Sequence, residues 1–186
     1  DMADPQTGQH AQDMKETISG FSSQLIFVEL ELAAMDEDGF QQALRDPDFY
    51  HFLPWLRRLR AFAPHQLETR LEQMLVERTP AGRGAWIRLF DETATALRFA
   101  FQGTEVTEAE ILNKLSDPSA DIRKEAGQSL SGVMQDNQRL FCLILNVIAK
   151  DKEIDDRWRG FKRPVSSRNL ANDVDDTTVD ALAGAV

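Results

Sequence analysis

Cysteine, long apolar runs and closely spaced histidines are all scarce in this chain of 186 residues. Its single cysteine, Cys142, excludes a disulfide framework and favours a reducing compartment, which we expect to be the cytoplasm. The longest apolar run, residues 140–149, contains Asn146 and is too short to span a bilayer. The first residues are acidic and polar, unlike a secretory signal peptide. Because the chain does not begin with Met, the sequence does not decide whether an export signal precedes Asp1.

Positive charge is also in short supply. The chain has 31 acidic and 21 basic residues, for a net charge of −10. Proteins bind nucleic acid and anionic membranes largely through Lys and Arg, so we expect neither partner. One basic cluster contains aromatic residues, but salt bridges around a loop explain it better than a base-stacking surface. Its members are Arg157, Trp158, Arg159, Phe161, Lys162, Arg163 and Arg168.

Apolar spacing predicts a mainly α fold of seven to nine helices with one small β-hairpin near residues 97–106. Residues 1–12 are polar, and we expect an extended arm there. From Asp13, two apolar faces recur at steps of three and four, so the first helix should be buried on two sides. The first face consists of Ile18, Phe21, Leu25, Val28, Leu32 and Met35, and the second of Ile26, Phe27, Leu30 and Ala33.

Turn and cap residues divide the rest of the chain. Asp36-Glu37-Asp38-Gly39 should end the first helix, and a short helix should follow over about 39–44. Pro54 suits the first turn of a helix that Pro64 ends. Thr79-Pro80 should close another helix, and the next one should place Trp86 and Phe90 in the core.

The alternation of Leu97, Phe99 and Phe101 with polar or small residues is typical of a strand. Gln102-Gly103 suits a tight turn, after which residues 104–106 can pair back. Thr107 followed by Glu110 predicts a capping box, with a helix running to about Leu115.

Asp117-Pro118 predicts the start of one long helix that reaches residue 149 or beyond, with its apolar end buried. A charged turn over 150–158 and a loop over 160–169 should follow. Asp175 or Asp176 should cap a terminal helix, with Asp173 and Asp180 nearby. We therefore expect a helical domain over 13–174, while 175–186 begin a helix whose pattern has not ended at Val186; the family resemblance given below implies that it leads into a catalytic domain.

Candidate chemical sites are weak. A zinc peptidase motif needs two histidines one helical turn apart, and His10, His51 and His65 lack such a neighbour. Asp36-Glu37-Asp38-Gly39 lacks the spaced oxygens of a calcium loop. Gly82-Arg83-Gly84 precedes a helix and could hold an anion, but no strand comes before it. Nothing in the sequence around the paired acids Asp91-Glu92 marks them for acid–base chemistry, and Cys142 lies in an apolar setting that makes a thiol inert. We assign no catalytic, cofactor-binding or metal-binding residue.

Several segments, in this order, resemble the amino-terminal region of the oligoendopeptidase F family of zinc metallopeptidases. They are residues 53–60 (Leu-Pro-Trp-Leu-Arg-Arg-Leu-Arg), 64–67 (Pro-His-Gln-Leu), 85–93, 150–161 and 167–172 (Ser-Arg-Asn-Leu-Ala-Asn). The resemblance implies a mainly helical fold that forms one wall of a channel in which oligopeptides are cut. It also implies zinc held by an H-E-x-x-H motif in a catalytic domain beyond Val186.

The resemblance therefore predicts an inactive amino-terminal domain without a cofactor of its own. Its partners would be its own catalytic domain and an oligopeptide substrate, and the isolated chain would self-associate through the region after Asp175. The alternative is a standalone helical interaction module without enzymatic activity. The length of the parent reading frame distinguishes the two.

Overall fold

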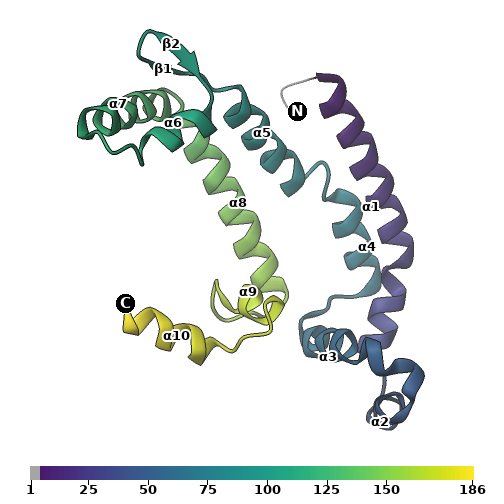
Figure 1. Cartoon of the computed structure of the whole chain (residues 1–186). Coiled ribbons are helices and arrows are strands. Elements are labelled where there is room, and N and C mark those ends of the chain that lie inside the picture. Colours follow the sequence, from purple (N-terminus) through teal and green to yellow (C-terminus); the bar gives the residue numbers. More distant parts are fainter. Residues whose placement is uncertain (1–4) are drawn as a thin grey trace. The chain divides into compact units, whose positions relative to one another are not determined.

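The computed structural model describes residues 5–186, and Figure 1 shows the path of the chain. Within that range the fold is mainly α with one small antiparallel hairpin, as the sequence predicts. The described residues form ten α-helices, more than the seven to nine predicted. The extra elements arise where the chain breaks at Asn137 and where residues expected as a loop form a short helix.

The helices and strands have the following bounds. The α-helices are α1 (Pro5–Ala33), α2 (Glu37–Arg45), α3 (Leu53–Phe62), α4 (Thr69–Arg78), α5 (Arg83–Ala96), α6 (Glu108–Lys114), α7 (Ala120–Asp136), α8 (Gln138–Trp158), α9 (Ser166–Ala171) and α10 (Asp176–Ala185). The short 3₁₀ helices are η1 (Pro47–Phe52) and η2 (Ala63–His65), and the strands are β1 (Phe99–Phe101) and β2 (Thr104–Val106).

The chain divides into two compact units. Unit 1 comprises Asp1–Glu16 with Thr79–Lys150, and unit 2 comprises Thr17–Arg78 with Asp151–Val186. Both α1 and α8 contribute to both units, since one boundary falls inside each of these helices, while the third follows the end of α4.

The core of unit 1 lies where the hairpin meets α6 and α7. Phe99, Phe101, Ile111 and Ala126 are buried together there. The predicted turn is confirmed, because Gln102 and Gly103 both have positive φ, 50° and 79°, as a tight hairpin turn requires. The predicted capping box at the start of α6 is also present.

The long helix predicted from Asp117 to residue 149 is wrong in two respects. It is two helices, α7 and α8, and at the break between them the Asn137 side-chain amide donates to the Val133 carbonyl at 2.9 Å. Its first cap is Ser119, while Asp117 accepts a hydrogen bond from the Ser119 N–H at 2.9 Å. Asx turns of this kind compete with helix caps for the same side chain.

Unit 2 has its core around α2 and α3. Ala43, Leu53 and Leu56 are buried there, with Leu32 and Phe40 packed against them. The predicted role of Pro54 is confirmed, because it lies in the first turn of α3. The helix predicted over about 39–44 is α2, which begins earlier, at Glu37, because Asp36 caps it by accepting from the Gly39 N–H at 2.7 Å.

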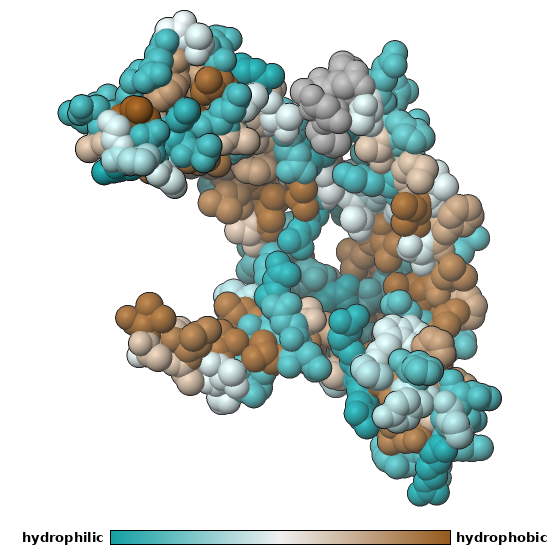
Figure 2. Space-filling model, in the orientation of Figure 1, coloured by the Kyte–Doolittle hydropathy of each residue, from teal (hydrophilic) through white to brown (hydrophobic). Residues whose placement is uncertain are grey.

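The first helix differs from the prediction at both its start and its surface. It begins at Pro5, so residues 5–12 are helical and not extended, while residues 1–4 lie outside the described range. The Ser19 and Ser23 side chains bond to the Val76 carbonyl and to Glu77 on α4, at 2.7 and 2.8 Å. Figure 2 shows hydrophobic side chains on the surface along α1. Burial on two sides was therefore wrong, because the first predicted face is largely exposed.

The apolar run of α8 is also less buried than predicted. Ile144 is buried, but Leu143, Leu145 and Cys142 are exposed. On α5, Phe90 is 45% exposed and contacts the Phe141 ring edge-on, with centroids 5.6 Å apart, so it is not a core residue.

Among the described residues, no single helix is long and apolar enough to cross a membrane. One bent pair of helices, Gln6–Ala33 with Glu37–Arg45, meets the criterion on length and composition alone.

Candidate functional site

The most highly connected polar group in the described chain is centred on Arg159, at the end of α8 in unit 2. Its guanidinium donates to both carboxylate oxygens of Glu72, at 2.6 and 2.9 Å, and to Asp155 at 2.8 Å. It also donates to the His65 carbonyl at 3.2 Å. We call Arg159, Glu72, Asp155 and His65 the Arg159 clasp, because it joins α4 and η2 to the end of α8.

His65 completes the clasp through its ring. Its Nδ1 lies 2.8 Å from the Arg159 carbonyl oxygen, which only accepts, so Nδ1 carries the proton and donates. The imidazole stacks on Phe161 with centroids 3.8 Å apart and planes 17° from parallel. The Nδ1 atom of His65 therefore has a hydrogen-bond partner, and one face of its ring packs against an aromatic ring.

Glu72 is the buried member of the clasp, with 9% of its side chain exposed. Burial by itself would raise the pKa of this carboxyl. The hydrogen bonds from Arg159 and from the Leu67 N–H, with the positive charge of Arg159, outweigh that effect and hold the pKa below its ordinary value of 4.5. The hydrogen bond to Glu72 likewise raises the pKa of Arg159. Both groups stay charged, which suits a structural ion pair and not a proton-transferring acid or base.

A second polar group fixes the turn between α9 and α10. Asn169 is buried, and its side-chain amide donates to Asp176 at 2.8 Å, while its backbone carbonyl accepts from the Val174 N–H. Ser166 also donates to Asp176, at 2.7 Å. The hydrogen bonds from Ser166 and Asn169 lower the pKa of Asp176 and hold the first turn of α10 against α9.

The sequence predicted either Asp175 or Asp176 as the cap of the terminal helix, and in the structure Asp175 caps α10. Its carboxylate accepts from the Thr178 N–H at 2.7 Å, and hydrogen bonds from Thr177 and Thr178 lower its pKa. The predicted loop over 160–169 is partly helical, since α9 begins at Ser166.

The predicted basic cluster is mostly paired with acids. Arg159 belongs to the clasp, Arg163 binds Asp180 through both terminal nitrogens at 2.8 and 2.6 Å, and Arg157 lies 3.7 Å from Glu153. Salt bridges thus involve three of the five basic residues of the cluster, Arg157, Arg159 and Arg163.

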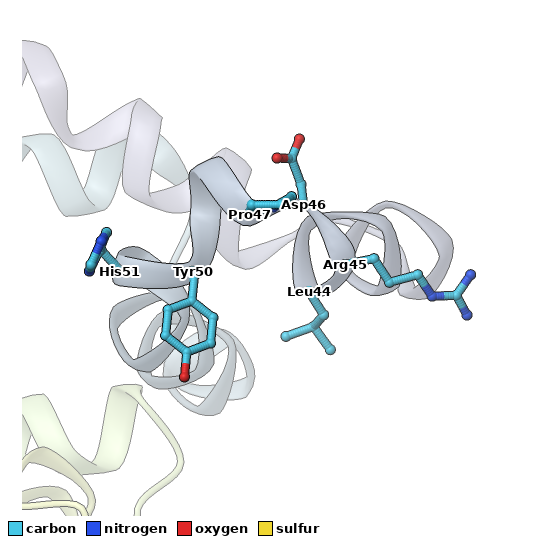
Figure 3. Close-up of a pocket in the computed structure, with 6 residues that line it drawn as sticks. All are labelled: Leu44, Arg45, Asp46, Pro47, Tyr50 and His51. Atoms are coloured by element: carbon cyan, nitrogen blue, oxygen red, sulfur yellow. The ribbon is translucent and has the colours of Figure 1, made fainter.

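A shallow pocket of about 410 Å³ lies between the end of α2 and η1, as Figure 3 shows. It is lined by Leu44, Arg45, Asp46, Pro47, Tyr50 and His51. The Arg45 and His51 side chains point in opposite directions in Figure 3. Polar groups that do not converge on one point are poorly suited to orient a small ligand.

Zinc does not fit the histidines of the described chain. In residues 5–186, no group of three or more His, Cys, Asp or Glu side chains is placed to hold a metal ion. His65 donates from Nδ1 to a carbonyl, which leaves Nε2 as its one ring nitrogen with a lone pair, and a single such nitrogen does not make a zinc site. We derive no metal-dependent step from these residues.

The glycine-rich segment at the start of α5 has a steric role. A Cβ on Gly84 would lie 2.7 Å from the Thr79 carbonyl oxygen, and the Gly84 N–H donates to that same oxygen at 2.9 Å. The glycine therefore permits a tight turn, and the amide that could have faced an anion is already bonded.

The sequence did not single out Glu72 or the role of Asn169. A glutamate one turn before Leu75 and Val76 on the apolar side of α4 was a signal for a buried charge. The partners were not visible, because His65 and Arg159 are 94 residues apart in the chain. The clasp does join two of the segments quoted for the family resemblance, residues 64–67 and 150–161.

Comparison with protein families agrees with that resemblance. Residues 31–99 match the family model described as Oligopeptidase F, a range that includes α2, α3 and α4 with Glu72 and His65. Comparisons with curated proteins and with solved structures found no match. The match covers less than half of the chain, and it supports an amino-terminal region of the oligoendopeptidase F family over residues 31–99.

Proposed function

We propose that this chain is the amino-terminal, channel-wall domain of a zinc metalloendopeptidase that cleaves oligopeptides. The match of residues 31–99 to the oligopeptidase F family carries the proposal. The site described above supports a scaffold, because its charged groups are engaged with one another and keep their charges. Zinc and the water-activating glutamate would belong to a separate catalytic domain.

The exposed apolar side chains of α8 and α10 support contact with that catalytic domain. Leu143, Leu145 and Leu182 are more than half exposed, and Figure 2 shows hydrophobic side chains over α10. Apolar patches of this kind mark interaction surfaces. The single cysteine, free and exposed, is compatible with a cytoplasmic enzyme.

Reconstitution tests the proposal. The parent gene would be used to express the H-E-x-x-H-containing remainder separately, and cleavage of quenched peptides of several lengths would be measured with and without this chain. We expect no cleavage by the chain alone, and a change in rate or length preference when it is added to the remainder.

Variants distinguish a specific interface from nonspecific hydrophobic association. Leu143→Glu combined with Leu145→Glu should weaken binding to the remainder, whereas Leu112→Glu, on the exposed surface of α6, should not. The proposal would be contradicted if adding this chain changed neither the cleavage rate nor the length preference of the remainder. A parent gene without any zinc motif would favour the standalone helical interaction module, for which the exposed helix surfaces are the supporting observation.

A further inference from the structure

One face of α1 has the spacing of a coiled-coil seam and no cover. Met14, Ile18, Phe21, Leu25 and Val28 follow one another at steps of four, three, four and three. All five side chains are exposed, between 38% and 61%. Alternation of three and four keeps a narrow apolar stripe facing one partner helix. We call these five residues the α1 seam.

The opposite side of α1 is already occupied. Ser19 and Ser23 bond to α4, and Ala33 is buried. In a heptad that places Ile18 and Leu25 at one seam position and Phe21 and Val28 at the other, both serines fall on the far side of the helix. The α1 seam is therefore a second, separate apolar face, and α4 does not cover it.

We propose that the α1 seam pairs antiparallel with the α1 seam of a second copy of this chain. Antiparallel seams place the two kinds of seam position opposite each other. The symmetric register sets Phe21 against Leu25 of the second copy and Ile18 against its Val28. Each layer then joins two apolar side chains, and the two-fold axis crosses the seam at the level of residue 23 along α1.

The charges beside the α1 seam favour this direction. In the antiparallel register, Lys15 of each copy faces Glu29 of the other, so that two complementary pairs flank the apolar layers. In a parallel pair, Glu29 and Glu31 of both copies would lie at the same end, together with the acidic start of α2. Like charges at close range oppose pairing, so charge selects the antiparallel arrangement.

Sedimentation equilibrium of the full chain over a range of micromolar concentrations tests the proposal. We expect a monomer–dimer equilibrium. Phe21→Glu combined with Leu25→Glu should weaken dimerisation by about 100-fold or more, because each copy would bring two charges into the two central apolar layers. Leu182→Glu, on the exposed surface of α10, is the matched control and should leave the dimer unchanged. Circular dichroism verifies that each variant keeps its helix content.

Charge reversal tests the register without touching the apolar layers. Lys15→Glu and Glu29→Lys should each raise the dimer dissociation constant by about 3- to 10-fold. The double reversal should restore the original value, because it rebuilds both pairs in the opposite sense. In a parallel pair these residues do not meet, so no restoration would occur.

Three results would overturn the proposal. They are a wild-type chain that stays monomeric, a dimer that Leu182→Glu disrupts while the Phe21 and Leu25 variant does not, and a double reversal that fails to restore affinity. A monomeric chain that floats with lipid vesicles would show that the α1 seam binds membrane instead.

Discussion

Glu72 offers the sharpest test of the Arg159 clasp. Glu72→Gln keeps the size of the side chain but removes its charge. It also replaces one acceptor oxygen with an amide that cannot accept from Arg159. The matched control is Glu153→Gln on α8, whose carboxylate lies 3.7 Å from Arg157 in an exposed pair.

The expected cost follows from the number and burial of the contacts. Glu72 accepts two hydrogen bonds from Arg159 and one from the Leu67 N–H. Removing one partner of a well-buried ion pair costs about 3–5 kcal/mol. Because Arg159 keeps Asp155 as a partner and is 20% exposed, we expect about 2 kcal/mol for Glu72→Gln. Exposed pairs contribute little, so Glu153→Gln should change stability by less than about 0.5 kcal/mol.

Urea unfolding followed by circular dichroism and tryptophan fluorescence measures the difference. With a slope of about 2 kcal/mol per molar urea, Glu72→Gln should lower the midpoint by about 1 M. The pH dependence adds a second readout. Since the pKa of Glu72 is lower in the folded chain, its contribution is present above about pH 4.5 and is lost as pH falls through the folded value. The wild type should therefore lose more stability than Glu72→Gln on acidification.

Equal midpoint shifts for Glu72→Gln and Glu153→Gln would refute the clasp as a stabilising contact. So would parallel acid profiles of the wild type and Glu72→Gln, because they would show that Glu72 has the same pKa in the folded and unfolded chain.

The remaining predictions concern packing, backbone and metal. Phe99→Ala should cost about 3–5 kcal/mol in unfolding free energy because the ring is fully buried. Phe90→Ala should cost only about 1 kcal/mol, since its main aromatic contact is at the surface. Gly84→Ala should destabilise by about 1–3 kcal/mol through collision with the Thr79 carbonyl, whereas Gly132→Ala inside α7, with open space around it, should stabilise by about 0.5–1 kcal/mol; thermal melts compare the pair. Metal analysis of the dialysed chain should find no stoichiometric zinc.

Local signals in the sequence predicted the local structure well. The turn at Gln102-Gly103 and the capping box of Thr107 with Glu110 depend only on residues within a few positions, so chain chemistry alone specifies them. The break at Asn137 was missed, because apolar spacing continues through it and a single asparagine that bonds its own helix ends α7.

The spacing of apolar residues and the cap residues specified most of the helices and their apolar faces, although residues 5–12 and α9 were predicted as non-helical. The sequence could not determine which apolar faces are covered, because periodicity describes one helix and burial depends on a second. Only the tertiary structure showed that α4 covers the serine side of α1 and leaves the α1 seam exposed. The Arg159 clasp is likewise visible only in the tertiary structure, because Glu72 and Arg159 lie 87 residues apart in the sequence and folding brings their charges together.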